Sequence, residues 1–444
     1  MQRVLLAFAL LFTVISPLRA QSLRDKLSNL FILGSGNDPL FLAGSGDPSN
    51  PAFIQAHGSH FIPAAEDGNA IIIAFITNSI SGNVANIPIS ATSGGSTFRF
   101  EGGVPVRTSL SAGPVYGERA QTLGKGRVLV GLNRTGIKFK SLRGAELDDI
   151  RLNFTHSNVD FPGCDSIFAA DCARRGLPAF ENDVIEFNLA LSVELTVTSL
   201  FLTYGLWDKV DVGVALPVVS TSLRGQSEAQ VVPFGPGAVA HFFGGTASNP
   251  VLHTSRSEEG SATGIGDVST RIKVNVRESG QLGIALLGDV RLPTGSEDDL
   301  LGSGYFSARG LGIVSARFGD FSPHANLGYL YRADDIATDA VLATIGFDHL
   351  LAPWATLAAD LLSELQVGNS NLHEPELVQI EAPFRRTIAP TTIPSRSDDI
   401  VNASLGIKLS AAPGLTVLAN AAWPLNRGGL RPNMFWTAGL EYNF

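Results

Sequence analysis

A strict alternation of apolar and polar residues over Ile185–Phe201 is the feature that most constrains the fold. The odd-numbered residues are apolar from Ile185 to Val197, whereas the even-numbered residues are mostly polar. Successive side chains of a strand point to opposite faces, so a period of two is typical of a β-strand and not of a helix. The stretch is longer than the ~5–6 residues of an ordinary strand, and it is long enough to cross a bilayer when tilted.

The same alternation returns along the C-terminal three-quarters of the chain. About twelve such segments start near residues 126, 184, 210, 266, 281, 304, 322, 338, 354, 398, 414 and 433. Short links such as 278–281 and 411–414 alternate with long ones such as 223–264 and 369–397, which is the pattern of an outer-membrane barrel. Since a sheet can span hydrocarbon only if it closes, we predict an all-β fold, an antiparallel transmembrane β-barrel of about 12 strands over residues 126–444.

The composition agrees with a barrel in a membrane. Charged residues make up 16% of the chain, against about 25% in an average soluble domain. Apolar residues make up 44%, and the formal net charge is −9. These values argue against a disordered chain and against a basic nucleic-acid-binding protein, so we expect no nucleic-acid partner.

The first twenty residues have the pattern of an export signal. Arg3 precedes an apolar run over Val4–Ile15, Pro17 interrupts the run, and Ala20 offers a small residue for cleavage. The run is shorter than the ~20 residues of a spanning helix. We therefore predict a signal peptide over residues 1–20 and an exported mature chain.

Residues 21–125 form a separate N-terminal segment, which we expect to be mainly helical or irregular. Ser22–Leu33 has the pattern of an amphipathic helix with Ser22 as its cap and Asp25 three residues later, and Ala64–Val84 could form a second, apolar helix. Such a segment could lie inside the barrel as a plug. A periplasmic cap and a partner-docking arm are the alternatives.

Two cysteines, Cys164 and Cys172, lie close together in a polar stretch. In an oxidising compartment we expect them to form a disulfide, and no histidine lies near them at a spacing typical of a metal site. The chain contains no HExxH, GxSxG, Walker A or GxGxxG motif. We therefore predict no enzyme activity, no metal and no cofactor.

Charged residues occur on the polar faces of several predicted strands, and these faces should line the lumen. The candidate lumen residues are Arg271, Lys273, Asp289, Arg291, Arg309, Asp360, Glu364, Glu186 and Glu194. Opposed basic and acidic walls would produce a field across a narrow pore and set its selectivity. Alternatively, these charges pair across neighbouring strands and hold the shape of the barrel.

The last strand has an apolar face that ends in an aromatic residue at the C-terminus. This face includes Trp436, Leu440, Tyr442 and Phe444. A terminal Phe with a Tyr two residues before it resembles the signal that the bacterial outer-membrane assembly machinery recognises. We therefore expect that machinery and outer-membrane lipid as partners, and the bacterial outer membrane as the location.

Four segments resemble a known family of outer-membrane proteins that are assigned to transport in the meta-pathway of phenol degradation. They are GERAQTLGKG at Gly117–Gly126, TYGLWDKVDVGVALP at Thr203–Pro217, SATGIGD at Ser261–Asp267 and LPTGSEDDLLGSG at Leu292–Gly304. This family is related in architecture to fatty-acid and aromatic-hydrocarbon channels, and the resemblance covers about residues 114–444. It implies a channel for passive passage of small, apolar or aromatic solutes. The alternative is a structural or adhesive surface barrel whose long loops bind a partner.

Overall fold

The computed structural model describes residues 21–43, 61–85, 98–101, 104–107, 111–155, 183–233, 241–246, 248–334, 337–368, 376–380 and 386–444. The signal peptide predicted over residues 1–20 and the disulfide predicted between Cys164 and Cys172 lie outside these described residues. The helices are α2 (Leu23–Asn29) and α4 (Ile62–Ala85). The strands are β1 (Phe98–Glu101), β2 (Val104–Arg107), β3 (Val128–Leu142), β4 (Ala145–Glu146), β5 (Ile150–Phe154), β6 (Val184–Trp207), β7 (Val210–Val232), β8 (Gly244–Thr246), β9 (Asn249–Val251), β10 (His253–Ile265), β11 (Val268–Ser279), β12 (Leu282–Leu292), β13 (Ser307–Ala316), β14 (Phe321–Arg332), β15 (Ala340–Ala352), β16 (Ala355–Gln366), β17 (Val378–Ile380), β18 (Arg386–Ile388), β19 (Ile400–Ala412), β20 (Leu415–Pro424) and β21 (Leu430–Asn443).

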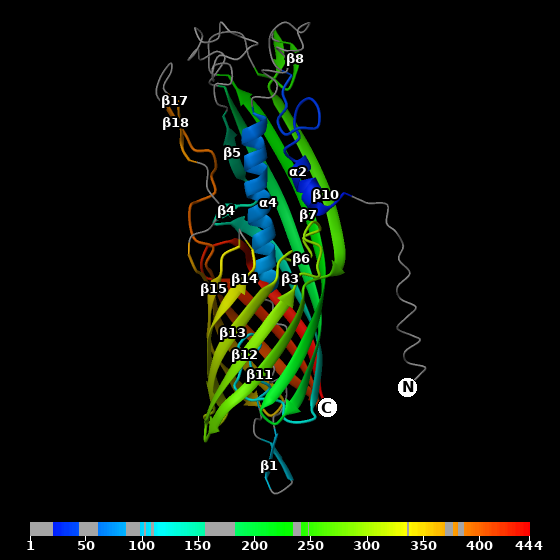
Figure 1. Cartoon of the computed structure of the whole chain (residues 1–444), viewed down its shortest axis with the longest axis vertical. Coiled ribbons are helices and arrows are strands. Elements are labelled where there is room, and N and C mark those ends of the chain that lie inside the picture. The colour runs from blue at the N-terminus through cyan, green and yellow to red at the C-terminus, as the bar shows by residue number, and fades with distance from the viewer. Residues whose placement is uncertain are drawn as a thin grey trace, which may run out of the picture.

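Twelve of these strands close into an antiparallel barrel (Figure 1). The order around the wall is β7, β11, β12, β13, β14, β15, β16, β19, β20, β21, β3 and β6, and β6 pairs back with β7. These are the twelve strands predicted from the alternation, so the predicted fold class is confirmed. Tight links such as those between β6 and β7 and between β11 and β12 define the turn end of the barrel, and the long connections define its loop end (Figure 1).

Two strands continue well beyond the barrel wall at the loop end. The lower half of β6 pairs with β3, but its upper half pairs with β5. In the same way β7 pairs with β11 near its start and with β10 further along. The result is a four-stranded sheet, β5–β6–β7–β10, that rises above the barrel and is not closed by pairing of its edge strands (Figure 1).

The apolar face of β6 changes side along the strand. In the barrel, Leu200 and Leu202 are exposed while Ser199 and Thr203 are buried; in the upper sheet, Leu191 and the other odd-numbered apolar residues are buried. The expectation that the apolar side of Ile185–Val197 faces lipid is therefore wrong. Above the membrane the outer face of the sheet contacts water and the inner face packs in an apolar core. The apolar residues therefore point inward there and the polar residues outward, the reverse of the arrangement in the membrane.

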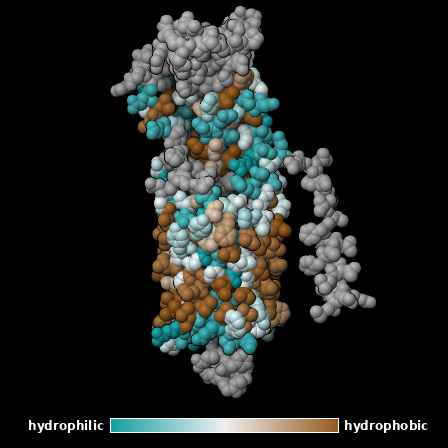
Figure 2. Space-filling view, viewed as in Figure 1, coloured by the Kyte–Doolittle hydropathy of each residue, from teal (hydrophilic) through white to brown (hydrophobic). Residues whose placement is uncertain are grey.

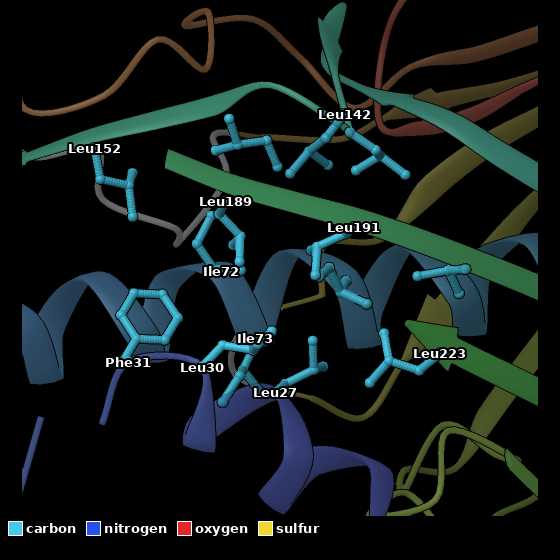
Figure 3. Packing of buried hydrophobic residues seen from close by; sticks show 14 of the residues in the cluster. Leu27, Leu30, Phe31, Ile72, Ile73, Leu142, Leu152, Leu189, Leu191 and Leu223 are labelled. Atoms are coloured by element: carbon cyan, nitrogen blue, oxygen red, sulfur yellow. The ribbon is translucent and has the colours of Figure 1, made fainter. Parts of the chain in front are cut away.

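The two N-terminal helices cover the inner face of this upper sheet (Figures 1 and 3). Helix α2 begins with the predicted capping box, in which the Ser22 hydroxyl accepts from the Asp25 N–H and the Asp25 carboxylate accepts from the Ser22 N–H. Leu27 of α2, Phe31 just after α2 and Ile72 of α4 pack with apolar side chains of the sheet in one buried cluster. None of the described helices has the length and hydropathy needed for a membrane span.

The outer surface of the barrel is mainly apolar, whereas the outer surface of the upper sheet is mainly polar (Figure 2). Exposed aliphatic side chains on the strands form the apolar zone, for example Leu202, Ile272, Leu286, Leu327, Ile345 and Leu405. Exposed aromatic side chains lie near both ends, including Trp207, Trp354 and Phe444 at the turn end and Tyr331 and Trp423 toward the loop end. An apolar band between aromatic girdles is the lipid-facing surface of an outer-membrane barrel. The protein is therefore a bacterial outer-membrane β-barrel, as predicted.

Candidate functional site

Residues 111–123 lie inside the barrel, and we call this segment the lumen loop. Its atoms bond to side chains from seven different wall strands: β7, β11, β13, β14, β15, β16 and β21. Only a segment in the lumen can reach strands around the whole circumference. The plug hypothesis concerns the whole N-terminal segment, residues 21–125. Among the described residues of this segment, the lumen loop lies in the lumen, whereas α2 and α4 pack in the buried cluster at the upper sheet.

The lumen loop enters and leaves at the turn end. Ser111 near its start bonds to Asp348, close to the β15–β16 turn, and the Leu123 N–H donates to Asp211 at the start of β7 at 2.9 Å. Between these ends the loop rises to Tyr116, whose hydroxyl lies 3.2 Å from Thr437 Oγ1 near the middle of β21. The loop therefore fills the turn-end half of the lumen.

Glu118 joins the lumen loop to the basic side of the wall. Its carboxylate accepts from Arg271 Nη1 at 3.0 Å and from Lys273 Nζ at 3.3 Å, both on β11. Its backbone N–H and C=O both bond to the Asn326 amide on β14, at 2.8 and 2.9 Å. Glu118 and both cations are buried, so these bonds are little screened by solvent.

Arg119 joins the loop to the acidic side. Its Nε donates to Asp348 Oδ1 at 2.8 Å, and its Nη2 donates to the other oxygen of the same carboxylate and to Ser111 Oγ. This is a bidentate arginine–carboxylate pair, which is the strongest common ion-pair geometry. Adjacent loop residues with opposite charges thus bind walls of opposite charge, and this fixes the orientation of the loop.

Gly117 sits at the closest approach of the loop to the wall. A Cβ at this position would overlap the imidazole of His324, which lies 2.7 Å from Asp360 Oδ1 through its Nε2. The Tyr116 N–H also donates to Asp360, at 3.4 Å. The absence of a side chain at Gly117 is therefore needed for the loop to lie against this pair.

Other charges in the lumen pair within the wall and do not involve the loop. Lys408 Nζ on β19 lies 3.2 Å from Glu441 on β21, and Arg332 on β14 pairs with Glu364 on β16. Asp289 on β12 lies 3.5 Å from Arg309 Nε on the next strand. These contacts stabilise the barrel, which matches the alternative interpretation of the lumen charges.

The structure places most of the candidate lumen residues where the alternation predicts, and corrects two of them. Arg271, Lys273, Asp289, Arg291, Asp360 and Glu364 are buried inside, and Arg309 is partly buried there. Glu186 and Glu194 are wrong as lumen residues, because both are exposed on the outer face of β6. Glu186 lies in the upper sheet, and Glu194 lies where β6 begins to pair with β3, bonded there to Lys138 at 2.6 Å.

Sequence reasoning missed the two residues that connect the lumen loop to both walls. Glu118 and Arg119 occur in GERAQTLGKG, one of the four segments that resemble the family. Their adjacent, opposite charges are the available signal, but nothing in the alternation shows that this segment turns back into the lumen. No group of three or more His, Cys, Asp or Glu among the described residues is arranged to hold a metal.

One side of the interior above the lumen loop is apolar. A single buried cluster extends from Phe31, which follows α2, and Phe154 of β5 to Ile137 of β3 and Phe435 of β21. Tyr116 packs against this cluster, and its ring lies 6.3 Å from the Phe435 ring in an edge-on arrangement. The ion pairs of Arg332 with Glu364 and of Asp289 with Arg309 lie near the loop ends of other wall strands, so this part of the lumen is apolar on one side and charged on the other.

Comparison with known proteins agrees with the resemblance seen in the sequence. Residues 183–353 match the family described as "Putative MetA-pathway of phenol degradation". The match covers the start of β6 to the end of β15, so it includes three strands of the upper sheet and seven of the twelve barrel strands. The motif at Gly117–Gly126 lies outside the matched residues. None of the curated proteins matches the sequence.

Several solved outer-membrane proteins have a similar architecture. An outer-membrane channel from Pseudomonas putida F1 is 11% identical, with 73% of this chain and 98% of that chain covered and a TM-score of 0.40. A mutant of the monoaromatic hydrocarbon channel TodX is 14% identical, with 80% and 97% covered and a TM-score of 0.35. A Pseudomonas aeruginosa FadL homologue is 10% identical, with 72% and 89% covered and a TM-score of 0.31. All three scores are below 0.5, so the description of the barrel rests on its own strand pairing.

Proposed function

We propose that this protein is an outer-membrane channel for passive passage of small apolar or aromatic solutes. The observation that supports this most directly is the continuous apolar interior between the upper sheet and Tyr116, inside a closed transmembrane barrel. Apolar solutes are favoured along this apolar surface. The ion pairs of Arg332 with Glu364 and of Asp289 with Arg309 lie on other strands of the wall. The family description, which concerns phenol degradation, points to the same class of solute.

The lumen loop closes the path toward the turn end, which faces the periplasm in barrels of this kind. Passage into the periplasm therefore requires the loop to shift or the solute to pass beside it. The loop is held by the ion pairs of Glu118 and Arg119 and by hydrogen bonds to the wall such as those of Tyr116 and Leu123, so a shift would break a defined set of contacts. We expect wild-type protein to conduct small ions poorly while the loop is in place.

Uptake by intact cells tests the proposal. Cells that lack the gene should take up dilute phenol or toluene more slowly than wild-type cells, and a plasmid copy should restore the rate. Ile137 is buried in the apolar path, so Ile137→Asn should lower restored uptake by about tenfold, since an unpaired buried amide costs about 1–3 kcal/mol. Ile137→Leu is the matched control and should restore uptake. If deletion leaves uptake unchanged for a panel of solutes, the channel proposal is wrong and the adhesive alternative gains support.

A further inference from the structure

A small cavity lies in the upper part of the molecule, away from the barrel lumen. One face of α4 forms its floor, β5 forms one wall, and residues from two further segments, 376–378 and 390–393, line the other side. The cavity has a volume of about 160 Å³. We propose that this cavity binds one small, uncharged, single-ring aromatic molecule.

The size of the cavity fits one aromatic ring. An engineered apolar cavity of about 150 Å³ in another protein stays dry and binds benzene. The volume here is nearly the same, so a benzene or phenol ring fits and a fused two-ring compound or a long acyl chain does not.

The walls of the cavity are mainly aliphatic and aromatic. Ile71 and Ile72 of α4, Leu152 and Phe154 of β5, and Ile393 line it. The Phe154 ring already lies edge-on to Phe31 and Phe187, with centroid distances of 6.5 and 5.5 Å. Aromatic rings favour such edge-on and offset arrangements, so a bound ring can join this group through Phe154.

Gly68 brings α4 close enough to form the cavity. A Cβ at Gly68 would lie 2.8 Å from Phe154 Cε1, so the Phe154 ring packs directly on the helix backbone. This contact fixes one edge of the cavity.

The rim of the cavity carries negative charge. Asp67 and Glu376 line it and are exposed, and no lysine or arginine occurs among the described lining residues. Two carboxylates disfavour an anionic ligand such as benzoate, but they can accept a hydrogen bond from a phenolic hydroxyl. The rim therefore selects phenol over benzoate, although the two rings are equal in size.

The position of the cavity also connects it to the apolar interior. Ala64 and Ile71 line the cavity and pack against the buried cluster that leads to Phe435 and Tyr116. That solutes bind in this cavity before they enter the channel rests on the proposed function. Binding of an aromatic molecule in the cavity does not rest on it.

Calorimetry on the full-length protein in detergent tests the site, with phenol and benzoate as probes at neutral pH. Phenol should bind to wild-type protein at least tenfold more tightly than benzoate. Ala64→Phe fills the cavity with a phenyl ring and should weaken phenol binding at least tenfold. Ala70→Phe is the matched control, because Ala70 is on the exposed side of the same helix, and it should bind phenol as wild type does. Replacing both rim carboxylates, by Asp67→Asn and Glu376→Gln, should reduce the preference for phenol.

Several results would overturn the proposal. Equal binding of phenol to the Ala64→Phe and Ala70→Phe variants would place the bound phenol elsewhere, and equal affinity for benzoate and phenol would refute the role of the rim. If Ala64→Phe does not fold, crystals of wild-type protein soaked in 4-bromophenol decide, since an anomalous bromine peak in the cavity is expected and its absence refutes the site. If the purified protein binds phenol in the cavity but deletion of the gene leaves phenol uptake by cells unchanged, the channel is refuted and the cavity is not. If deletion slows phenol uptake but the purified protein binds no phenol, the cavity is refuted and the channel is not.

Discussion

The ion pairs of Glu118 determine how firmly the lumen loop closes the barrel. Glu118→Gln keeps the size of the side chain but removes the charge that faces Arg271 and Lys273, at 3.0 and 3.3 Å. The Lys273 side chain is fully buried and that of Arg271 is 6% exposed, so both cations lose a partner in a site with little water. Removing one member of a buried ion pair costs about 3–5 kcal/mol. Since about 1.4 kcal/mol is a factor of ten, loop displacement should become about 10²- to 10⁴-fold more frequent.

Single-channel recording in planar bilayers measures this change. Wild-type protein should be closed to small ions for most of the record, and Glu118→Gln should open in frequent steps. The recording should use salt near 0.1 M and then 1 M. Buried pairs are screened much less than exposed ones, so the difference between the variants should persist at 1 M.

Glu441→Gln provides the matched control. Glu441 is also buried and pairs with a fully buried lysine, Lys408 at 3.2 Å, but this pair joins two wall strands and does not hold the loop. It should lower the stability of the barrel and leave the opening frequency near that of wild type. Equal opening of the two variants, or an unchanged record for a correctly folded Glu118→Gln protein, would refute the idea that Glu118 holds the loop.

Three other changes test the remaining parts of the description. Leu202→Arg places a charge in the lipid-facing band and should lower the free energy of folding in liposomes, measured by urea titration, by about 2–4 kcal/mol. Ser192→Arg, on the outer face of the same strand above the lipid-facing band, should change the free energy of folding by less than about 0.5 kcal/mol. Ile72→Ala should lower the stability of the packing of α4 by about 2–5 kcal/mol. The expected result is faster proteolysis of the helix, while the barrel remains resistant. Gly117→Ala should raise the opening frequency as Glu118→Gln does, because the added methyl group displaces the loop from His324.

The charged residues of the lumen show how far the sequence could predict the site. Arg271, Lys273 and Asp360 are inside, as predicted from their positions in the strands. Their partners could not be predicted, because Glu118 reaches β11 from a segment more than a hundred residues earlier in the chain. The same limit applies to the cavity, whose walls come from α4, β5 and residues of the segments 376–378 and 390–393.

The sequence by itself determined the number of strands, the alternation of short turns and long loops, and the capped helix at Ser22. These features depend on local periodicity and on neighbouring residues, which the chain carries wherever it folds. Only the tertiary structure decided which face of β6 is inside, since an apolar face turns toward lipid in the membrane and toward a packed core above it. It also decided that the lumen loop lies in the turn-end half of the barrel, because that arrangement depends on contacts with seven strands that meet only when the barrel closes.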